Sequence, residues 1–223
     1  MPVSPNETTD PPRSPRSRRE ERRERELELR RADVIAAAAA EFAEKGFDGA
    51  QMSALAGRAE VALGTLYSLF ESKEQLFQAV IETSAEAVRA SIQAEVRTVS
   101  DPRERLLRLI DAGFERFRSE PVFFRIYAQS THGWPARIRA TMGESAQAQF
   151  TDFVQWVVGL ARDAAAAGAL RGIDPEAFGL ALMGALVNIT SAISAGTTTR
   201  SAEALAADVR ALFEHLLAPE GAR

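Results

Sequence analysis

Apolar residues recur along this chain at the three- and four-residue spacing of α-helices, and no segment alternates with the two-residue period of a strand. Ile35, Ala39 and Phe42, for example, follow one face of a long first helix that Gly46 should end. The pattern predicts an all-α protein of about nine helices. Their expected ranges are about 18–46, 51–59, 63–70, 72–96, 102–119, 121–131, 135–167, 175–195 and 201–217.

Capping residues fix where several of these helices start. Ser72 with Gln75 three residues later matches a capping box. Asp101 and Asp174 each precede a proline, which combines a cap with a residue suited to the first helical turn. Ser201 caps the last predicted helix. These four capping residues fix where helices begin in the C-terminal two thirds of the chain.

The stretch GTLYSLFESKEQLF, residues 64–77, concentrates unusual chemistry between two short helices and a long one. Two short helices joined by a tight turn, with the second amphipathic, make a helix-turn-helix, whose second helix enters the major groove of DNA. Gly64 allows close approach of a phosphate, and the Tyr67 hydroxyl can bind one. Lys73 begins the next helix, where positive charge and free N–H groups both favour a phosphate.

At these residues the chain resembles the tetracycline-repressor (TetR) family of transcription regulators, over about residues 30–80. The matching positions are Leu55, Ala56, Ala59, Val61, Gly64, Tyr67, Phe70, Lys73, Glu74 and Leu76. The resemblance implies a cytoplasmic, homodimeric, ligand-responsive regulator, in the first instance a repressor, which binds a near-palindromic double-stranded operator and is released by a small-molecule effector. The residues expected to contact DNA are Gln51, Ala62, Leu63, Gly64, Thr65, Tyr67, Ser68 and Lys73, with Arg18, Arg19 and Arg22 from the preceding segment.

The motif departs from the family pattern at four positions. Glu60 replaces the turn glycine, Ala62 replaces a capping serine, Leu63 stands where a polar residue is common, and Leu69 replaces an aromatic residue. Residues 32–77 also hold seven acids and only three bases, although phosphate contacts normally supply most DNA affinity. An alternative is therefore a helical homodimer that binds a ligand or protein and has lost sequence-specific DNA reading.

An arginine-rich segment precedes this electrostatically poor motif. The formal net charge is −4, yet residues 1–31 hold nine arginines against seven acids. These arginines could cross the DNA backbone or enter the minor groove. Alternatively, the segment is a solvated extension of the first helix, since Glu21–Arg25 and Glu26–Arg30 have favourable four-residue spacing. The chain is accordingly divided into a disordered arm (1–17), a helix-turn-helix domain (18–77) and an effector-binding and dimerisation domain (78–223).

Aromatic and sulfur-containing side chains are frequent in the C-terminal region. At helical spacing such residues are most often core, and the resemblance adds the possibility of an adaptable pocket for an apolar or aromatic effector. The candidate pocket residues are Phe114, Phe117, Phe124, Tyr127, Met142, Phe150, Phe153, Met183 and Asn188. Asn188 has a competing interpretation as a buried, satisfied amide within an apolar helix.

The helix at 175–195 is apolar nearly all round, which predicts burial on two sides. With the last helix it would form a four-helix dimer interface, as in the family that the chain resembles. The interface residues expected are Phe178, Leu182, Leu186, Ile189 and Ile193 on one helix, and Leu205, Val209, Leu212, Phe213 and Leu216 on the other.

The composition argues against other classes of function. There is no cysteine, only His132 and His215 could supply imidazole, and no carboxylates cluster at ligand spacing. We therefore expect no enzyme activity, no metal and no cofactor. No apolar run reaches the roughly 20 residues of a membrane span, and no apolar stretch follows the N-terminal arginines as in a secretory signal. The effector, the operator and the target genes are not readable from the sequence.

Overall fold

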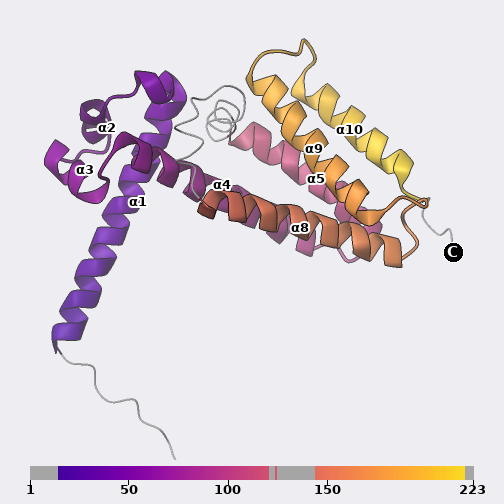
Figure 1. The fold of residues 1–223 in the computed structure, drawn as a ribbon, viewed down its shortest axis with the longest axis horizontal. Helices are drawn as coiled ribbons and strands as arrows, with labels where there is room; N and C mark the ends of the chain where they lie inside the picture. The colour runs from indigo at the N-terminus through magenta and orange to yellow at the C-terminus, as the bar shows by residue number, and fades with distance from the viewer. Residues whose placement is uncertain (1–14, 121–123, 125–143, 219–223) are drawn as a thin grey trace, which may run out of the picture.

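The computed structural model describes residues 15–120, 124 and 144–218, and this part of the chain forms eight helices. They are α1 (Pro15–Gly49), α2 (Met52–Arg58), α3 (Leu63–Leu69), α4 (Lys73–Arg97), α5 (Pro102–Ser119), α8 (Glu144–Ala166), α9 (Pro175–Ser194) and α10 (Ala202–Leu216). Figure 1 shows α1, α2 and α3 at one end and α5, α8, α9 and α10 bundled at the other, with α4 running between them. The predicted all-α class is confirmed.

All four predicted helix caps are present. The side chain of Ser72 accepts a hydrogen bond from the Gln75 amide at the start of α4, and the Gln75 side chain accepts in turn from the Glu71 amide. Asp101 and Asp174 cap α5 and α9, each followed by proline in the first turn, and Ser201 caps α10. Local chemistry therefore fixes the starts of these helices independently of the packing around them.

The N-terminal core joins α1, α2, α3 and the first turns of α4. Phe42, Phe47 and Phe77 form a cluster in which the Phe42 and Phe77 rings meet edge to face, with centroids 4.8 Å apart. Leu66 and Phe70, at the middle and end of α3, are fully buried against this cluster. The orientation of α3 is thus determined by its apolar face.

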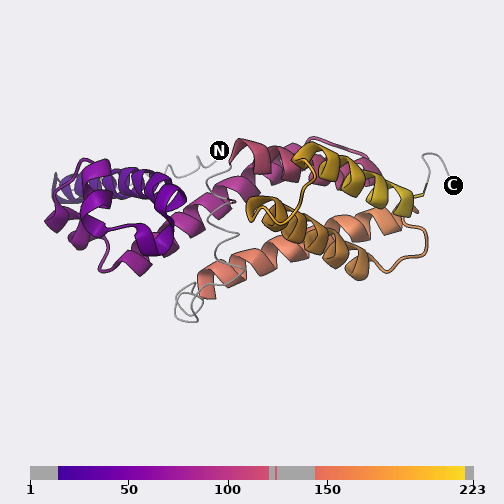
Figure 2. The ribbon, with the colours of Figure 1, turned by 90° about the horizontal axis from the view of Figure 1, so that it is seen from above.

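The C-terminal core joins the second half of α4 to α5, α8, α9 and α10, which Figure 2 shows from above. Helices α8 and α9 approach closely because Gly179 has no side chain: a Cβ there would lie 2.9 Å from Val158 Cγ2. Phe178 on α9 and Phe213 on α10 meet edge to face, with ring centroids 5.4 Å apart. Side chains from all five helices therefore share one core.

Two helix boundaries differ from the sequence expectation. Helix α1 begins at Pro15, within the segment 1–17 that was expected to be disordered. At its other end Gly46 has a left-handed φ of 70°, as predicted for a stop, but one more helical turn continues to Gly49. Apart from Phe124, the predicted helix at 121–131 lies outside the described residues, as do the first residues of the one predicted at 135–167.

The expectation that no apolar run reaches membrane length is wrong for α9. This helix of 20 residues has a mean hydropathy of 1.7, enough by length and composition to cross a membrane, although it is weak evidence for a span. Helix α9 packs against α8 and α10 in the bundle, and Phe178 and Leu182 are almost fully buried there. A core helix needs the same apolar composition as a membrane helix, so this composition does not distinguish the two.

Candidate nucleic-acid interface

The two faces of α3 differ sharply. Leu66 is buried under the N-terminal core, whereas Leu63, Gly64, Tyr67 and Ser68 lie on the exposed side. Tyr67 is 49% exposed, so about half of its surface is open to a partner and the other half is covered by the protein. The exposed face of α3 therefore presents one aromatic hydroxyl, a leucine and small residues to whatever approaches it.

The remaining predicted contacts on α2 and α3 have defined local geometry. Gln51 is exposed at the N-cap of α2 and makes no capping hydrogen bond. Ala62, the N-cap of α3, is exposed and also contributes no side-chain cap, as its methyl group dictates. Thr65 is only partly exposed, and its backbone carbonyl accepts a hydrogen bond from the Ser68 hydroxyl over 2.7 Å. Ser68 must release this bond before it can donate to another group.

The turn between α2 and α3 adopts the conformation that glycine favours, although the residue is Glu60. Its φ is 54°, and it is the one non-glycine residue with positive φ in the described part of the chain. The amides of Glu60 and Val61 donate to Gly57 and Ala56, which closes the end of α2. The expected mismatch at this position is confirmed, and it places backbone strain at the centre of the motif.

Intramolecular contacts engage all three basic residues of 32–77. Lys73 donates from Nζ to the carbonyls of Phe47 (2.8 Å) and Ala50 (3.0 Å), with its ammonium 4.4 Å from the Phe47 ring centroid. Lys73 therefore secures the end of α1 to the start of α4. A phosphate contact, the predicted role of Lys73, would have to use the remaining ammonium proton.

Arg58 is held by a pair of acids on α1. Its guanidinium donates two hydrogen bonds to Glu44 and lies 3.3 Å from the buried carboxylate of Glu41, which also pairs with Lys45 over 2.6 Å. The hydrogen bond from Arg58 lowers the pKa of Glu44 below its ordinary value, and the same bond raises the pKa of Arg58. These contacts fasten α2 to α1.

Sequence reasoning missed two residues that position the motif, Glu41 and Arg31. Glu41 is only 3% exposed and binds two cations, a role hidden because it lies beside Phe42 in an alanine-rich run. Arg31 donates to the Leu69 carbonyl over 2.8 Å and stacks 4.1 Å above the Phe70 ring, which ties the end of α3 to α1. The contacts of Glu41 with Arg58 and of Arg31 with Leu69 each join residues more than a dozen positions apart, so no local pattern signals them; the Glu41–Lys45 pair has ordinary four-residue helical spacing.

The first half of α1 projects away from the rest of the chain (Figure 1). Arg18, Arg19 and Arg22 are exposed on this projection. Arg22 pairs with Glu26 over 3.1 Å, with side chains 81% and 64% exposed. Such an exposed pair contributes little to stability and leaves the arginine open to competition from another anion.

Most predicted pocket residues are packed within the protein. Phe114, Phe153 and Met183 are buried in the C-terminal core. The rings of Phe117 and Phe124 meet edge to face, with centroids 5.2 Å apart. Phe150 is 43% exposed, and Tyr127 and Met142 lie outside the described residues. The interpretation of Asn188 as a buried amide is wrong: it is exposed, and its side chain donates to the Gly184 carbonyl over 2.8 Å.

The predicted dimer residues also divide by burial. Five are buried within the single chain, namely Phe178, Leu182, Leu186, Val209 and Phe213, and four are partly buried, namely Ile189, Ile193, Leu205 and Leu216. The buried five belong to the core of the protomer and have no surface to offer a partner. Leu212 (58%) and the unpredicted Leu180 (50%) are instead the large apolar side chains exposed on α10 and α9.

Glycine at position 60 should stabilise the protein. Glu60→Gly removes the left-handed strain of a residue with a Cβ, so we expect the free energy of unfolding to rise by about 1 kcal/mol. Urea denaturation followed by circular dichroism measures this change. Glu60→Ala is the matched control because it removes the charge and keeps the strain. Equal stabilisation by both variants would show that charge, and not backbone conformation, is the cause.

Among known proteins, the first similarity covers the helix-turn-helix part of the chain. Residues 34–80, from the middle of α1 into α4, match the family model of bacterial regulatory proteins of the tetR family. The transcriptional activator FasR of Mycolicibacterium smegmatis is 26% identical over 119 residues, which are 53% of this chain and 54% of FasR. The chain thus spans about half the length of the curated relatives it matches.

The whole fold also has solved counterparts. The fatty acid degradation regulator FadR from Bacillus halodurans superposes with a TM-score of 0.71, at 19% identity, covering 87% of this chain and 96% of FadR. AibR, solved with isovaleryl coenzyme A and operator DNA, gives a TM-score of 0.64 at 18% identity, covering 82% and 97%. The match of residues 34–80 thus places this segment in the tetR family of bacterial regulatory proteins, and the superpositions show that the chain shares the fold of these solved regulators.

Proposed function

We propose that this protein is a cytoplasmic, ligand-responsive transcriptional repressor that binds a near-palindromic operator as a homodimer. The observation that carries the proposal is the exposed face of α3. Leu63, Gly64, Tyr67 and Ser68 are exposed on this face, while the opposite face of the helix is buried in the N-terminal core. In a helix-turn-helix the exposed face enters the major groove. The similarity to FasR, a transcriptional activator, and to AibR, which was solved on its operator, supports the DNA-binding part of this proposal.

Base recognition by α3 should be modest. Neither arginine nor asparagine, which make two-pronged contacts to guanine or adenine, stands on its exposed face. Leu63 can contact a thymine methyl group, and Tyr67 can donate to a phosphate. Phosphate contacts position a protein without reading sequence, so α3 contributes register more than specificity.

Affinity for the DNA backbone should come from the first half of α1. The bases within 32–77 make contacts within the module, whereas Arg18, Arg19 and Arg22 lie on a projecting helix, where the pair of Arg22 with Glu26 is exposed to competing anions. A helix with side chains is roughly 10–12 Å wide, and the minor groove is about 6 Å wide. The helical part of the arm therefore lies along the backbone and does not enter that groove.

Dimerisation should use the exposed stripe of α9 and α10 around Leu180 and Leu212. Ala181 and Ala211 are exposed beside these leucines, so a second copy could approach closely. An effector that changes the distance between the two recognition helices would then release the operator. FadR is a regulator of fatty acid degradation, and AibR was solved with an acyl coenzyme A. We therefore propose an apolar effector.

The salt dependence of operator binding tests the arginines of α1. Each phosphate contact that is lost lowers the magnitude of the log–log salt slope by about 0.9. The triple change Arg18→Gln, Arg19→Gln, Arg22→Gln should therefore flatten the slope by up to about five units per dimer. Fluorescence anisotropy with the DNA flanking the gene, from low to moderate salt, measures the slope.

The matched control for that experiment is Arg97→Gln with Arg118→Gln, since both arginines are exposed on the C-terminal half of the molecule. This control should leave the slope unchanged. An unchanged slope in the triple variant as well would make the arm a solvated helix. That result would favour the alternative of a homodimer that has lost sequence-specific DNA binding. The intramolecular contacts of Lys45, Arg58 and Lys73 also motivate this alternative.

The oligomeric state tests the proposed dimer face. Leu180→Glu with Leu212→Glu would bury unpaired carboxylates in the interface, which is strongly unfavourable. We expect the double variant to be monomeric by size-exclusion chromatography with light scattering, and to lose operator affinity because one half-site is left. Leu29→Glu, on the 62% exposed leucine of α1, is the control and should stay dimeric. A dimeric double variant would place the interface elsewhere.

A further inference from the structure

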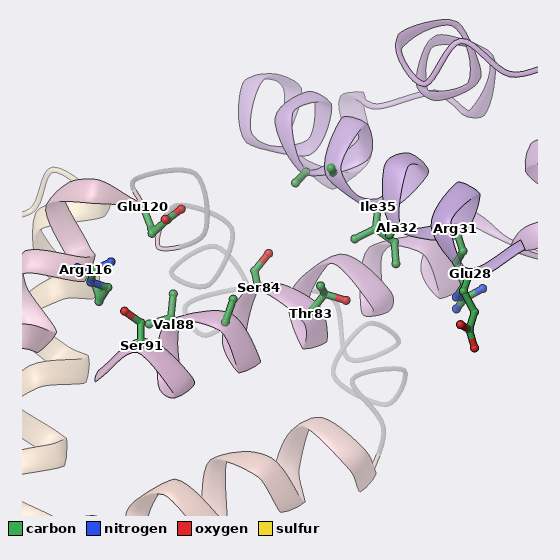
Figure 3. Close-up of a pocket in the computed structure, with 13 residues that line it drawn as sticks. Glu28, Arg31, Ala32, Ile35, Thr83, Ser84, Val88, Ser91, Arg116 and Glu120 are labelled. Atoms are coloured by element: carbon green, nitrogen blue, oxygen red, sulfur yellow. The ribbon is translucent and has the colours of Figure 1, made fainter. Parts of the chain in front are cut away.

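A cavity of about 470 Å³ lies where the two halves of the molecule meet. Figure 3 shows its three walls: α1 with Ala32 and Ile35, α4 with Ser84 and Val88, and the end of α5 with Arg116. None of the pocket residues expected from the sequence lines it. Its volume is within the range of about 300–1,000 Å³ that small-molecule sites occupy.

The cavity exists because small side chains face each other across the seam between α1 and α4. Ala36 and Ala39 stand on α1, and Ala87 and Ser91 on α4, where larger residues would close the gap. This part of α4 lies between the two hydrophobic cores, after Ile81 and around Val88. A molecule bound here would contact the DNA-binding half and the C-terminal half together.

An arginine lies at each end of the cavity, and the two arginines differ in how fully the protein satisfies their hydrogen bonds. At one end Arg31 is already engaged by the Leu69 carbonyl and the Phe70 ring. At the other, Arg116 donates from Nη2 to Glu95 over 3.1 Å, while its buried Nε–H has no hydrogen-bond partner among the described residues. A buried donor without a partner is costly, so a shift of the Arg116 side chain that brought this N–H to an acceptor oxygen of a ligand would be stabilised.

The charge around the cavity limits what that ligand can be. Carboxylates also border it, Glu28 near Arg31 and Glu120 near Arg116. A polyanion such as a coenzyme A phosphate group would be repelled by both. One negative charge beside Arg116, with an apolar chain running along Ile35, Val88 and the alanines, complements the lining.

We propose that this cavity binds an apolar monocarboxylate of the fatty-acid type, with its carboxylate on Arg116 and its chain between α1 and α4. Occupancy then favours one angle between the DNA-binding half and the C-terminal bundle, because the ligand contacts both. The regulatory part of this inference rests on the proposed function, whereas the binding part does not.

Calorimetric titration of the DNA-free protein tests the binding. Decanoate should bind about 15-fold more tightly than octanoate, since each buried CH₂ group tightens binding about fourfold. Octanoate should in turn bind more tightly than 1-octanol, which lacks the charge. Arg116→Met should abolish the preference for octanoate over 1-octanol.

A filling variant tests the location. Ala87→Phe places a large side chain in the cavity and should weaken decanoate binding at least tenfold. Ala90→Phe is the matched control, because Ala90 is exposed on the same helix and does not line the cavity. Both should fold, since both positions are exposed. Full decanoate binding by Ala87→Phe, or no binding by the unaltered protein, would overturn the proposal.

The regulatory consequence is measured separately, with operator DNA. Decanoate should weaken operator binding of the unaltered protein and of Ala90→Phe, and leave that of Ala87→Phe unchanged. Decanoate binding that leaves operator affinity unchanged would refute the coupling alone. Operator binding in the absence of decanoate tests the proposed function by itself, so failure of one claim is distinguishable from failure of the other.

Discussion

Helix α4 contributes side chains to both hydrophobic cores, so its orientation links the two halves of the molecule. Its first turns place Phe77 and Ile81 in the N-terminal core, and its later turns place Val88 and Ile92 in the C-terminal core. A single helix cannot pack into two cores independently, because its stripes are fixed relative to each other by the 3.6-residue period. Any tilt of α4 therefore moves the recognition helix relative to the bundle.

The cations of the helix-turn-helix hold its own helices together. Lys73 binds the end of α1, Arg58 binds Glu41 and Glu44, and Arg31 binds the end of α3. These contacts orient α2 and α3 before any DNA is present. They also pair part of the module's positive charge with its own acids, which is why we propose the projecting half of α1 for contacts to the DNA backbone. We therefore propose that the residues that stabilise the helix-turn-helix are different from those that bind the DNA backbone.

The bundle shows how a nearly uniform apolar helix is used on two sides. Phe178 and Leu182 face the protomer core, whereas Leu180 on the same helix faces outward. The sequence places both stripes on α9, but the stripes have similar composition and nothing local says which is internal. Packing decides, because Gly179 admits α8 only on its own side of the helix. The outward stripe is the surface that we propose for a second copy.

Sequence alone determined the helices and the motif. Ser72, Asp101, Asp174 and Ser201 act within four residues of themselves, so their caps were readable without tertiary information. Amphipathic spacing predicted Thr65 and Ser68 on the side of α3 opposite its apolar face; Ser68 is exposed there, and Thr65 is partly exposed. The left-handed backbone at Glu60 was signalled by the family resemblance, in which glycine stands at this turn position.

Only the tertiary structure decided which long-range partners each side chain has. The buried role of Glu41, the engagement of Lys73 by the Phe47 and Ala50 carbonyls, and the cavity beside Arg116 all join segments that are distant in sequence. Periodicity assigns a residue to a face of its own helix. It carries no information about which helix, cation or empty space lies opposite that face, because packing of the whole chain determines it.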